Sequence, residues 1–127
     1  MKYLIFALSA GLLLAGCAPA PSDAQTFRQV SAATAMELMK SETDYVIVDV
    51  RTQAEYDEGH IPDAICIPNE SIGAEPIPEL PDPEQTIFVY CRSGRRSKEA
   101  AGKLAELGYT NVVEFGGIMD WTGPIVS

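Results

Sequence analysis

The clearest sign of chemistry in the chain is a cysteine followed closely by a glycine and three arginines. Residues 91–96 read Cys-Arg-Ser-Gly-Arg-Arg and come directly after an apolar run. Cations and the free N–H groups of a helix start lower the pKa of a thiol from about 8.5 to about 3.5–7.5, which makes it a nucleophilic thiolate. Gly94 allows the backbone to curl until successive amides face one centre and form an anion nest. We therefore predict that Cys91 is the catalytic nucleophile. The predicted anion-binding residues are Arg92, Ser93, Gly94, Arg95 and Arg96.

The distribution of charge indicates what kind of anion would bind. The chain has 127 residues, with 18 Asp and Glu, 9 Lys and Arg, and a net charge of −9. Such a chain lacks the general positive charge that nucleic-acid binding requires, so we expect no nucleic-acid partner. Four of the nine Lys and Arg residues nevertheless lie within residues 91–98, which favours a small anionic substrate. The alternative is a buried structural thiol beside a solvated run of arginines.

The segments that must position Cys91 alternate between strand and helix patterns. Apolar runs predict strands at 27–30, 45–48, 64–67, 86–90 and 112–115. Helices are predicted after the caps Ser31 and Thr52 and over 97–107, with a Pro-rich loop over 69–83. This alternation predicts an α/β fold with a central, mostly parallel sheet and helices on both faces. Chemistry in such sheets lies beyond the carboxyl ends of the strands, where Cys91 falls.

The N-terminal residues have the pattern of a targeting segment. Residues 1–16 carry one Lys, an apolar run and a close of small residues, the layout of a secretory signal peptide. The apolar run is shorter than the ~20 residues of a membrane span. Leu14-Ala15-Gly16-Cys17 resembles the lipobox of bacterial lipoproteins, in which the cysteine is lipidated and becomes the mature N-terminus. Plain secretion is the alternative.

The predicted organisation is therefore a signal peptide over 1–16, a flexible tether over 17–26 and one domain over 27–127. The tether is rich in Pro, Ala and polar residues. Ala18 after Cys17 resembles the pattern of lipoproteins sent to the outer membrane of Gram-negative bacteria. We expect a protein of the bacterial envelope, held by its N-terminal lipid at the periplasmic face of the outer membrane.

The domain resembles the rhodanese family of single-domain sulfurtransferases. The matching segments occur in family order and are Val48-Asp49-Val50-Arg51, Glu55-Tyr56, Gly59-His60-Ile61-Pro62, 64–68, 89–97, Gly108-Tyr109 and 116–121. Together they span roughly residues 27–124 of the chain. The resemblance implies a rhodanese-like fold and sulfur transfer from an anionic donor such as thiosulfate.

In that mechanism Cys91 holds the sulfur as a persulfide and passes it to a thiol or cyanide acceptor. The resemblance also implies a monomer that needs no metal or organic cofactor. Related phosphatases have a longer loop, with an arginine six positions after the cysteine, where this chain has Ser97. The six-residue loop from Cys91 to Arg96 therefore favours a sulfurtransferase, although length alone leaves arsenate chemistry open.

Four further side chains need an interpretation. We expect Asp49 to hold neighbouring loops by accepting backbone hydrogen bonds, and His60 to be structural. Asp63 stands where relatives usually have a glycine, and Asp tolerates a positive φ better than most residues. Cys66 is expected to be a small buried apolar residue. The alternative is a resolving thiol for Cys91, which would make the protein a thiol-redox or sulfur-sensing lipoprotein of the envelope.

Overall fold

The computed structural model describes residues 26–127, so the predicted signal peptide, Cys17 and nearly all of the tether lie outside the described residues. Five strands alternate with helices along the chain. In order, the elements are β1 Phe27–Gln29, α1 Ala32–Ser41, β2 Tyr45–Asp49, α2 Gln53–Glu58, β3 Ile65–Cys66, η2 Asn69–Ser71, β4 Thr86–Cys91, α3 Arg95–Glu106, β5 Asn111–Gly117 and η3 Ile118–Asp120. None of the helices among these residues is long and apolar enough to cross a bilayer.

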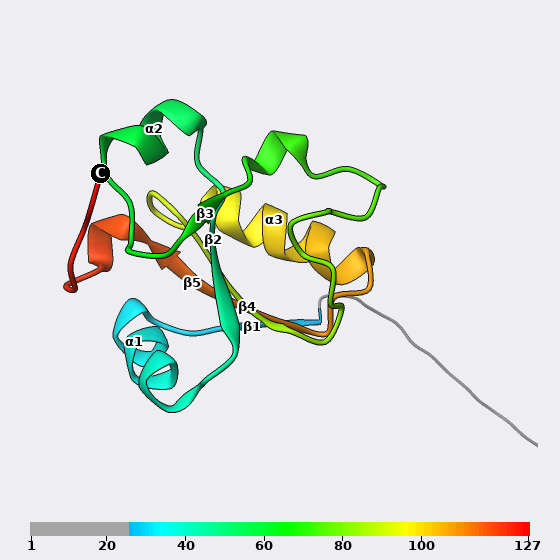
Figure 1. Cartoon of the computed structure of the whole chain (residues 1–127), viewed down its shortest axis with the longest axis horizontal. Helices are drawn as coiled ribbons and strands as arrows, with labels where there is room; N and C mark the ends of the chain where they lie inside the picture. The colour runs from blue at the N-terminus through cyan, green and yellow to red at the C-terminus, as the bar shows by residue number, and fades with distance from the viewer. Residues whose placement is uncertain (1–25) are drawn as a thin grey trace, which may run out of the picture.

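The strands form one sheet in the order β1-β5-β4-β2-β3, and every strand pair is parallel. Figure 1 shows α1 and α3 on opposite sides of this sheet. The carboxyl ends of β2, β4 and β5 therefore meet at one edge, where the loop after β4 begins. The prediction of an α/β fold with a parallel sheet and helices on both faces is confirmed.

Two apolar cores account for this layering. The core on the α3 face joins Val89 and Cys91 of β4 to Ala100 and Leu104 of α3. The core on the α1 face joins Phe88 and Tyr90 of β4 to the small residues Ala32 and Ala35 of α1, among others. Because side chains alternate along a strand, successive residues of β4 enter opposite cores. Cys91 is thereby directed to the face that α3 covers.

Local sequence signals agree closely with the elements. Ser31 caps α1 through a bond from the Thr34 amide to its hydroxyl, and Thr52 forms the expected capping box with Glu55. The long Pro-rich loop is held by the buried side chains Ile77 and Leu80.

The start of α3 differs from the prediction. The helix begins at Arg95, with Gly94 as its N-cap, rather than at Ser97. Ser97 is completely buried and turns its hydroxyl inward, so it does not cap the helix. The physical reason is the positive φ of Gly94, +126°, which reverses the chain early enough for the helix to begin two residues sooner.

Candidate active site

Cys91 is the last residue of β4, and its sulfur lies at the centre of the loop that leads into α3. The residue is buried, with 1% of its surface exposed. The Gly94 amide donates a hydrogen bond to Sγ over 3.0 Å, and the Ser97 hydroxyl lies 3.5 Å from Sγ. The Gly94 amide and the Ser97 hydroxyl thus both direct polar groups at this sulfur. A backbone amide and a hydroxyl directed at one sulfur give the loop the form of an anion nest.

The electrostatic balance at Sγ favours the thiolate. Burial raises the pKa of Cys91, but hydrogen bonds from the Ser97 hydroxyl and from the amides of Ser97, Gly94 and Ser93 outweigh it. The net pKa of Cys91 is below its ordinary value. A thiol that ionises readily is the form that attacks a sulfur donor.

The loop rests against the end of β5 through Gly117. A Cβ at Gly117 would overlap the carbonyl oxygen of Arg92 and crowd the Ser93 amide. The Met119 amide also donates to the Arg92 carbonyl over 3.2 Å. Glycine is therefore required at this position by close approach of two backbones, which fixes the loop around the sulfur.

The three arginines of the loop have different surroundings. Arg96 donates to both carboxylate oxygens of Glu55, over 2.8 and 3.1 Å, and so ties α2 to the start of α3. Arg95 lies on the surface and pairs with Glu99 over 3.3 Å. Among residues 26–127, Arg92 has no acidic partner within 4 Å, and it is exposed within the loop. The amides and Ser97, rather than paired guanidinium groups, make the direct contacts to the sulfur.

Comparison with known proteins identifies the family and the fold of the domain. A family model described as the rhodanese-like domain matches residues 31–123. The chain belongs to the rhodanese-like domain family. Its relatives include sulfurtransferases, and its fold is that of solved rhodanese domains.

Two sequence relatives of this rhodanese-like domain carry the activity in their names. The chain is 38% identical over 79 residues to thiosulfate sulfurtransferase PspE of Escherichia coli, covering 62% of this chain and 76% of the relative. It is 35% identical over 96 residues to thiosulfate sulfurtransferase GlpE of Coxiella burnetii, covering 75% of this chain and 87% of the relative.

Solved structures with the same fold include rhodanese domains. A structure titled rhodanese with anions from E. coli has a TM-score of 0.61 and 36% identity, covering 65% of this chain and 98% of that one. A rhodanese-like domain from Anabaena has a TM-score of 0.69 and 27% identity, covering 78% of each chain. The expectation of a rhodanese-like domain with sulfurtransferase relatives is thus confirmed.

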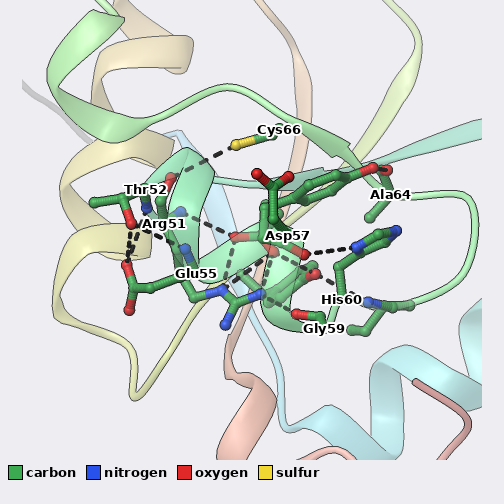
Figure 2. A network of polar contacts seen from close by, with 12 residues as sticks. Arg51, Thr52, Glu55, Asp57, Gly59, His60, Ala64 and Cys66 are labelled. Atoms are coloured by element: carbon green, nitrogen blue, oxygen red, sulfur yellow. Dashed lines mark hydrogen bonds and ion pairs between the residues drawn. The ribbon is translucent and has the colours of Figure 1, made fainter. Parts of the chain in front are cut away.

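A buried network of ionic and polar contacts stabilises the edge of the sheet beside the loop 91–96. The Asp49 carboxylate accepts from the Arg51 amide over 2.9 Å, from the Arg51 guanidinium over 2.7 Å and from the Tyr90 hydroxyl over 2.7 Å. Arg51 also donates to the carbonyl of Gly59, and the Ile61 amide donates to the Tyr90 hydroxyl. Figure 2 shows Arg51 directed at Gly59, with Thr52 and Glu55 beside it. Asp49 accepts one backbone hydrogen bond, from Arg51, and acts on the neighbouring loop through the side chains of Arg51 and Tyr90 rather than by the backbone bonds that we predicted.

The surroundings of His60 and the backbone of Asp63 indicate structural roles for both residues. The His60 ring stacks on Tyr56 with centroids 3.7 Å apart, and its Nδ1 lies 2.8 Å from the Tyr56 carbonyl. Asp63 has a φ of 71° and is the one non-glycine residue with positive φ in the described chain. The positive φ that its position suggested is confirmed.

Cys66 is separated from Cys91 both by distance across the sheet and by the face of the sheet that it occupies. Cys66 is in register with Asp49, and Asp49 with Tyr90, so two strand spacings of roughly 4.8 Å separate Cys66 from β4. Register partners share a face, which places Cys66 with Tyr90 on the α1 face, whereas Cys91 faces α3. A disulfide needs Cα atoms within about 7 Å. Burial and the charge of Asp49 also raise the pKa of Cys66. The geometry disfavours a resolving thiol.

Two residues at the site were not identified from sequence as functional. Ser97 was predicted only as the first residue of a helix, and Glu114 only as part of a strand. Glu114 is 2% exposed and contacts the Ser97 hydroxyl. The available signal was a lone carboxylate inside the apolar run Val112-Val113-Glu114-Phe115. In residues 26–127, no three His, Cys, Asp or Glu side chains are gathered as metal ligands.

Proposed function

We propose that the protein is a rhodanese-type sulfurtransferase that carries sulfane sulfur as a persulfide on Cys91. The observation that carries this proposal is the buried Cys91 sulfur facing the Gly94 amide and the Ser97 hydroxyl, in a loop that lowers the pKa of the thiol. The same donors that stabilise a thiolate can stabilise a persulfide anion, which has its charge one atom further out.

With thiosulfate as donor, the Cys91 thiolate attacks the outer sulfur, and the bond between the two sulfur atoms of thiosulfate breaks. The outer sulfur stays on the enzyme as Cys91–S–S⁻, and the electron pair of the broken bond leaves with sulfite. A thiophilic acceptor then attacks the terminal sulfur. With cyanide, thiocyanate leaves and the Cys91 thiolate is restored. This sequence divides one transfer into two steps through a covalent intermediate.

Arg92 would guide the anionic donor, because it is exposed in the loop and has no acidic partner within 4 Å among the described residues. The amides of Ser93 and Gly94 line the same loop. Arg95 and Arg96 would contribute less to donor binding than Arg92, since their guanidinium groups pair with Glu99 and Glu55 and the opposite charges offset each other. No metal or organic cofactor takes part in the proposed steps.

Intact mass after incubation with thiosulfate tests the proposal. The wild-type chain should gain one sulfur atom, and cyanide should remove it with release of thiocyanate. Cys91→Ser should gain none while keeping its fold, because the exchange is nearly isosteric. Cys66→Ser is the matched control and should still be loaded. Loading that depends on Cys66 instead of Cys91 would overturn the mechanism.

We also propose that the domain acts as a monomer anchored by lipid on Cys17 at the periplasmic face of the outer membrane. The support is the signal-peptide pattern of residues 1–16 and the lipobox-like Leu14-Ala15-Gly16-Cys17. The same mass measurement on protein extracted from bacterial membranes tests the anchor. A chain that begins at Cys17 and carries acyl groups is expected, and an unmodified Cys17 would refute the proposal.

A further inference from the structure

The Glu55 carboxylate occupies the guanidinium group of Arg96, a residue of the loop around the sulfur. Arg96 Nη1 donates to Oε1 over 2.8 Å and Nη2 donates to Oε2 over 3.1 Å. Two parallel N–H groups facing two oxygens are also the arrangement in which arginine binds oxyanions such as phosphate. Glu70 of η2 acts on Arg96 through its charge as well, but it lies beyond the 4 Å of an ion pair. While Glu55 is bound, these two N–H groups are withheld from a donor anion.

The position of Glu55 is fixed by the start of α2. Its Oε1 accepts from the Thr52 amide over 3.0 Å and from the Thr52 hydroxyl over 3.1 Å, and the Glu55 amide donates to that hydroxyl. Figure 2 shows Glu55 joined to Thr52 in this way. The side chains of Glu55 and Arg96 are partly buried, whereas those of Arg95 and Glu99 are exposed. Arg96 is therefore held by a partner that is itself anchored.

Arg96 lies within electrostatic reach of the nucleophile. It directly precedes Ser97, whose hydroxyl lies 3.5 Å from Cys91 Sγ. It also lies two residues after Gly94, whose amide donates to the same sulfur. The hydrogen bonds to Glu55 raise the pKa of Arg96 against the effect of burial, and the charge of the Cys91 thiolate raises it further. A change in the net charge of the Arg96–Glu55 pair therefore acts on the site of reaction.

The ion pairs also reduce the number of uncompensated cations around the loop. Residues 91–98 contain four Lys and Arg side chains. Among residues 26–127, neither Arg92 nor Lys98 has a carboxylate within 4 Å, whereas the other two are paired. Lys98 Nζ lies over the loop, 3.1 Å from the place where a Cβ on Gly94 would stand. The positive charge offered to an anion is thus smaller than the four side chains suggest.

We propose that Glu55 is a positioning residue that sets the charge preference of the Cys91 site, because it keeps Arg96 from binding an oxyanion donor. Attraction of thiosulfate then depends on the uncompensated cations Arg92 and Lys98. Sulfite, the product with the same oxyanion group, can leave without breaking a bidentate contact to Arg96. The charge of Glu55 thereby limits the affinity for anionic donors relative to less charged ones. This inference rests on the proposed sulfur transfer by Cys91.

Alkylation of Cys91 by two reagents of different charge tests the proposal without a sulfur donor. Iodoacetate is an anion and iodoacetamide is neutral, but the same thiolate attacks both, so the ratio of the two rates is independent of the fraction of thiolate. The rates are followed on the peptide that contains Cys91. Glu55→Gln should raise the ratio of the iodoacetate rate to the iodoacetamide rate about threefold to tenfold at low ionic strength, since a negative charge is lost.

The reverse substitution keeps the test decisive if Glu55→Gln does not fold. Arg96→Gln leaves the Glu55 carboxylate uncompensated, so the ratio should fall below that of the wild type. Replacing both residues by glutamine removes a pair without net charge, so the ratio should return close to the wild-type value. A purely structural role would alter the two rates alike and would not produce opposite shifts that cancel.

Glu99→Gln is the matched control, because it also releases an arginine of the loop, but at an exposed site. It should change the ratio less than about twofold. An unchanged ratio in Glu55→Gln, or an equal shift in Glu99→Gln, would overturn the inference.

Steady-state kinetics connect the ratio to sulfur transfer. Glu55→Gln should lower the KM for thiosulfate and strengthen inhibition by sulfite, both by about the factor seen in the alkylation ratio. Persulfide formation with an unchanged ratio in Glu55→Gln would refute this inference and leave the proposed function intact. A shifted ratio in a protein that forms no persulfide would refute the proposed function and leave the charge effect of Glu55 intact.

Discussion

Replacing Glu55 by glutamine should weaken the domain at neutral pH, by an amount that the structure bounds. The Arg96 guanidinium, helped by the amide and hydroxyl of Thr52 and opposed by burial, lowers the pKa of Glu55 from 4.5 to about 2. Each pH unit of displacement corresponds to about 1.4 kcal/mol. The charge of Glu55 therefore contributes at most about 3.5 kcal/mol to the free energy of unfolding.

The measurable loss should be smaller than this bound. The side chains of Arg96 and Glu55 are 24% and 28% exposed, so water and salt screen their attraction. Glutamine can also keep the capping-box bonds with Thr52. We expect Glu55→Gln to lower the free energy of unfolding by about 1–2 kcal/mol at pH 7.

The pH dependence of this loss in stability shows whether the charge of Glu55 causes it. A carboxyl group with a lowered pKa in the folded state stabilises it fully above the unfolded pKa and loses that contribution as pH falls. The difference in the free energy of unfolding between wild type and Glu55→Gln should thus be constant above about pH 5.5. It should shrink as the pH falls from 4.5 toward 2.

Denaturant unfolding at several pH values measures this difference. Glu37→Gln is the control, because Glu37 pairs with Lys40 at an exposed site, where both side chains are more than 70% exposed. It should change the free energy of unfolding by less than about 0.5 kcal/mol. An equal loss for Glu55→Gln at neutral and acidic pH would show that packing, not charge, is responsible.

Two other substitutions probe the loop itself. Gly117→Ala would place a Cβ where the Arg92 carbonyl lies, so it should lower the free energy of unfolding by about 1–3 kcal/mol and reduce sulfur transfer. Gly102→Ala is the control. A Cβ there meets no atom within 4 Å, so the change should leave the free energy of unfolding unchanged or raise it. Arg92→Ala should raise the KM for thiosulfate about tenfold with little change in kcat, since one charge-assisted contact is lost. The matched change Arg95→Ala removes a guanidinium already paired with Glu99, and an equal rise in its KM would contradict the role of Arg92.

Much of the fold could be predicted because its signals are local. Capping residues such as Ser31 and Thr52 satisfy the first amides of a helix wherever the chain is placed, and both caps are formed. The continuous apolar run before Cys91 predicted a strand, and β4 is the central strand of five. The start of α3 was missed by two residues, because Gly94 could serve either as a loop residue or as a cap.

The sequence by itself determined that Cys91 follows a buried strand and precedes a helix, since chain neighbours remain neighbours in any fold. Only the tertiary structure decided which distant groups reach the sulfur and which do not. Strand order separates Cys66 from Cys91 and puts them on opposite faces, while the pairing of β4 with β5 brings Glu114 to Ser97. It also decided that Arg96 pairs with Glu55, 41 residues away along the chain. Strand order and register arise from the burial of many side chains together, so no local spacing encodes these contacts.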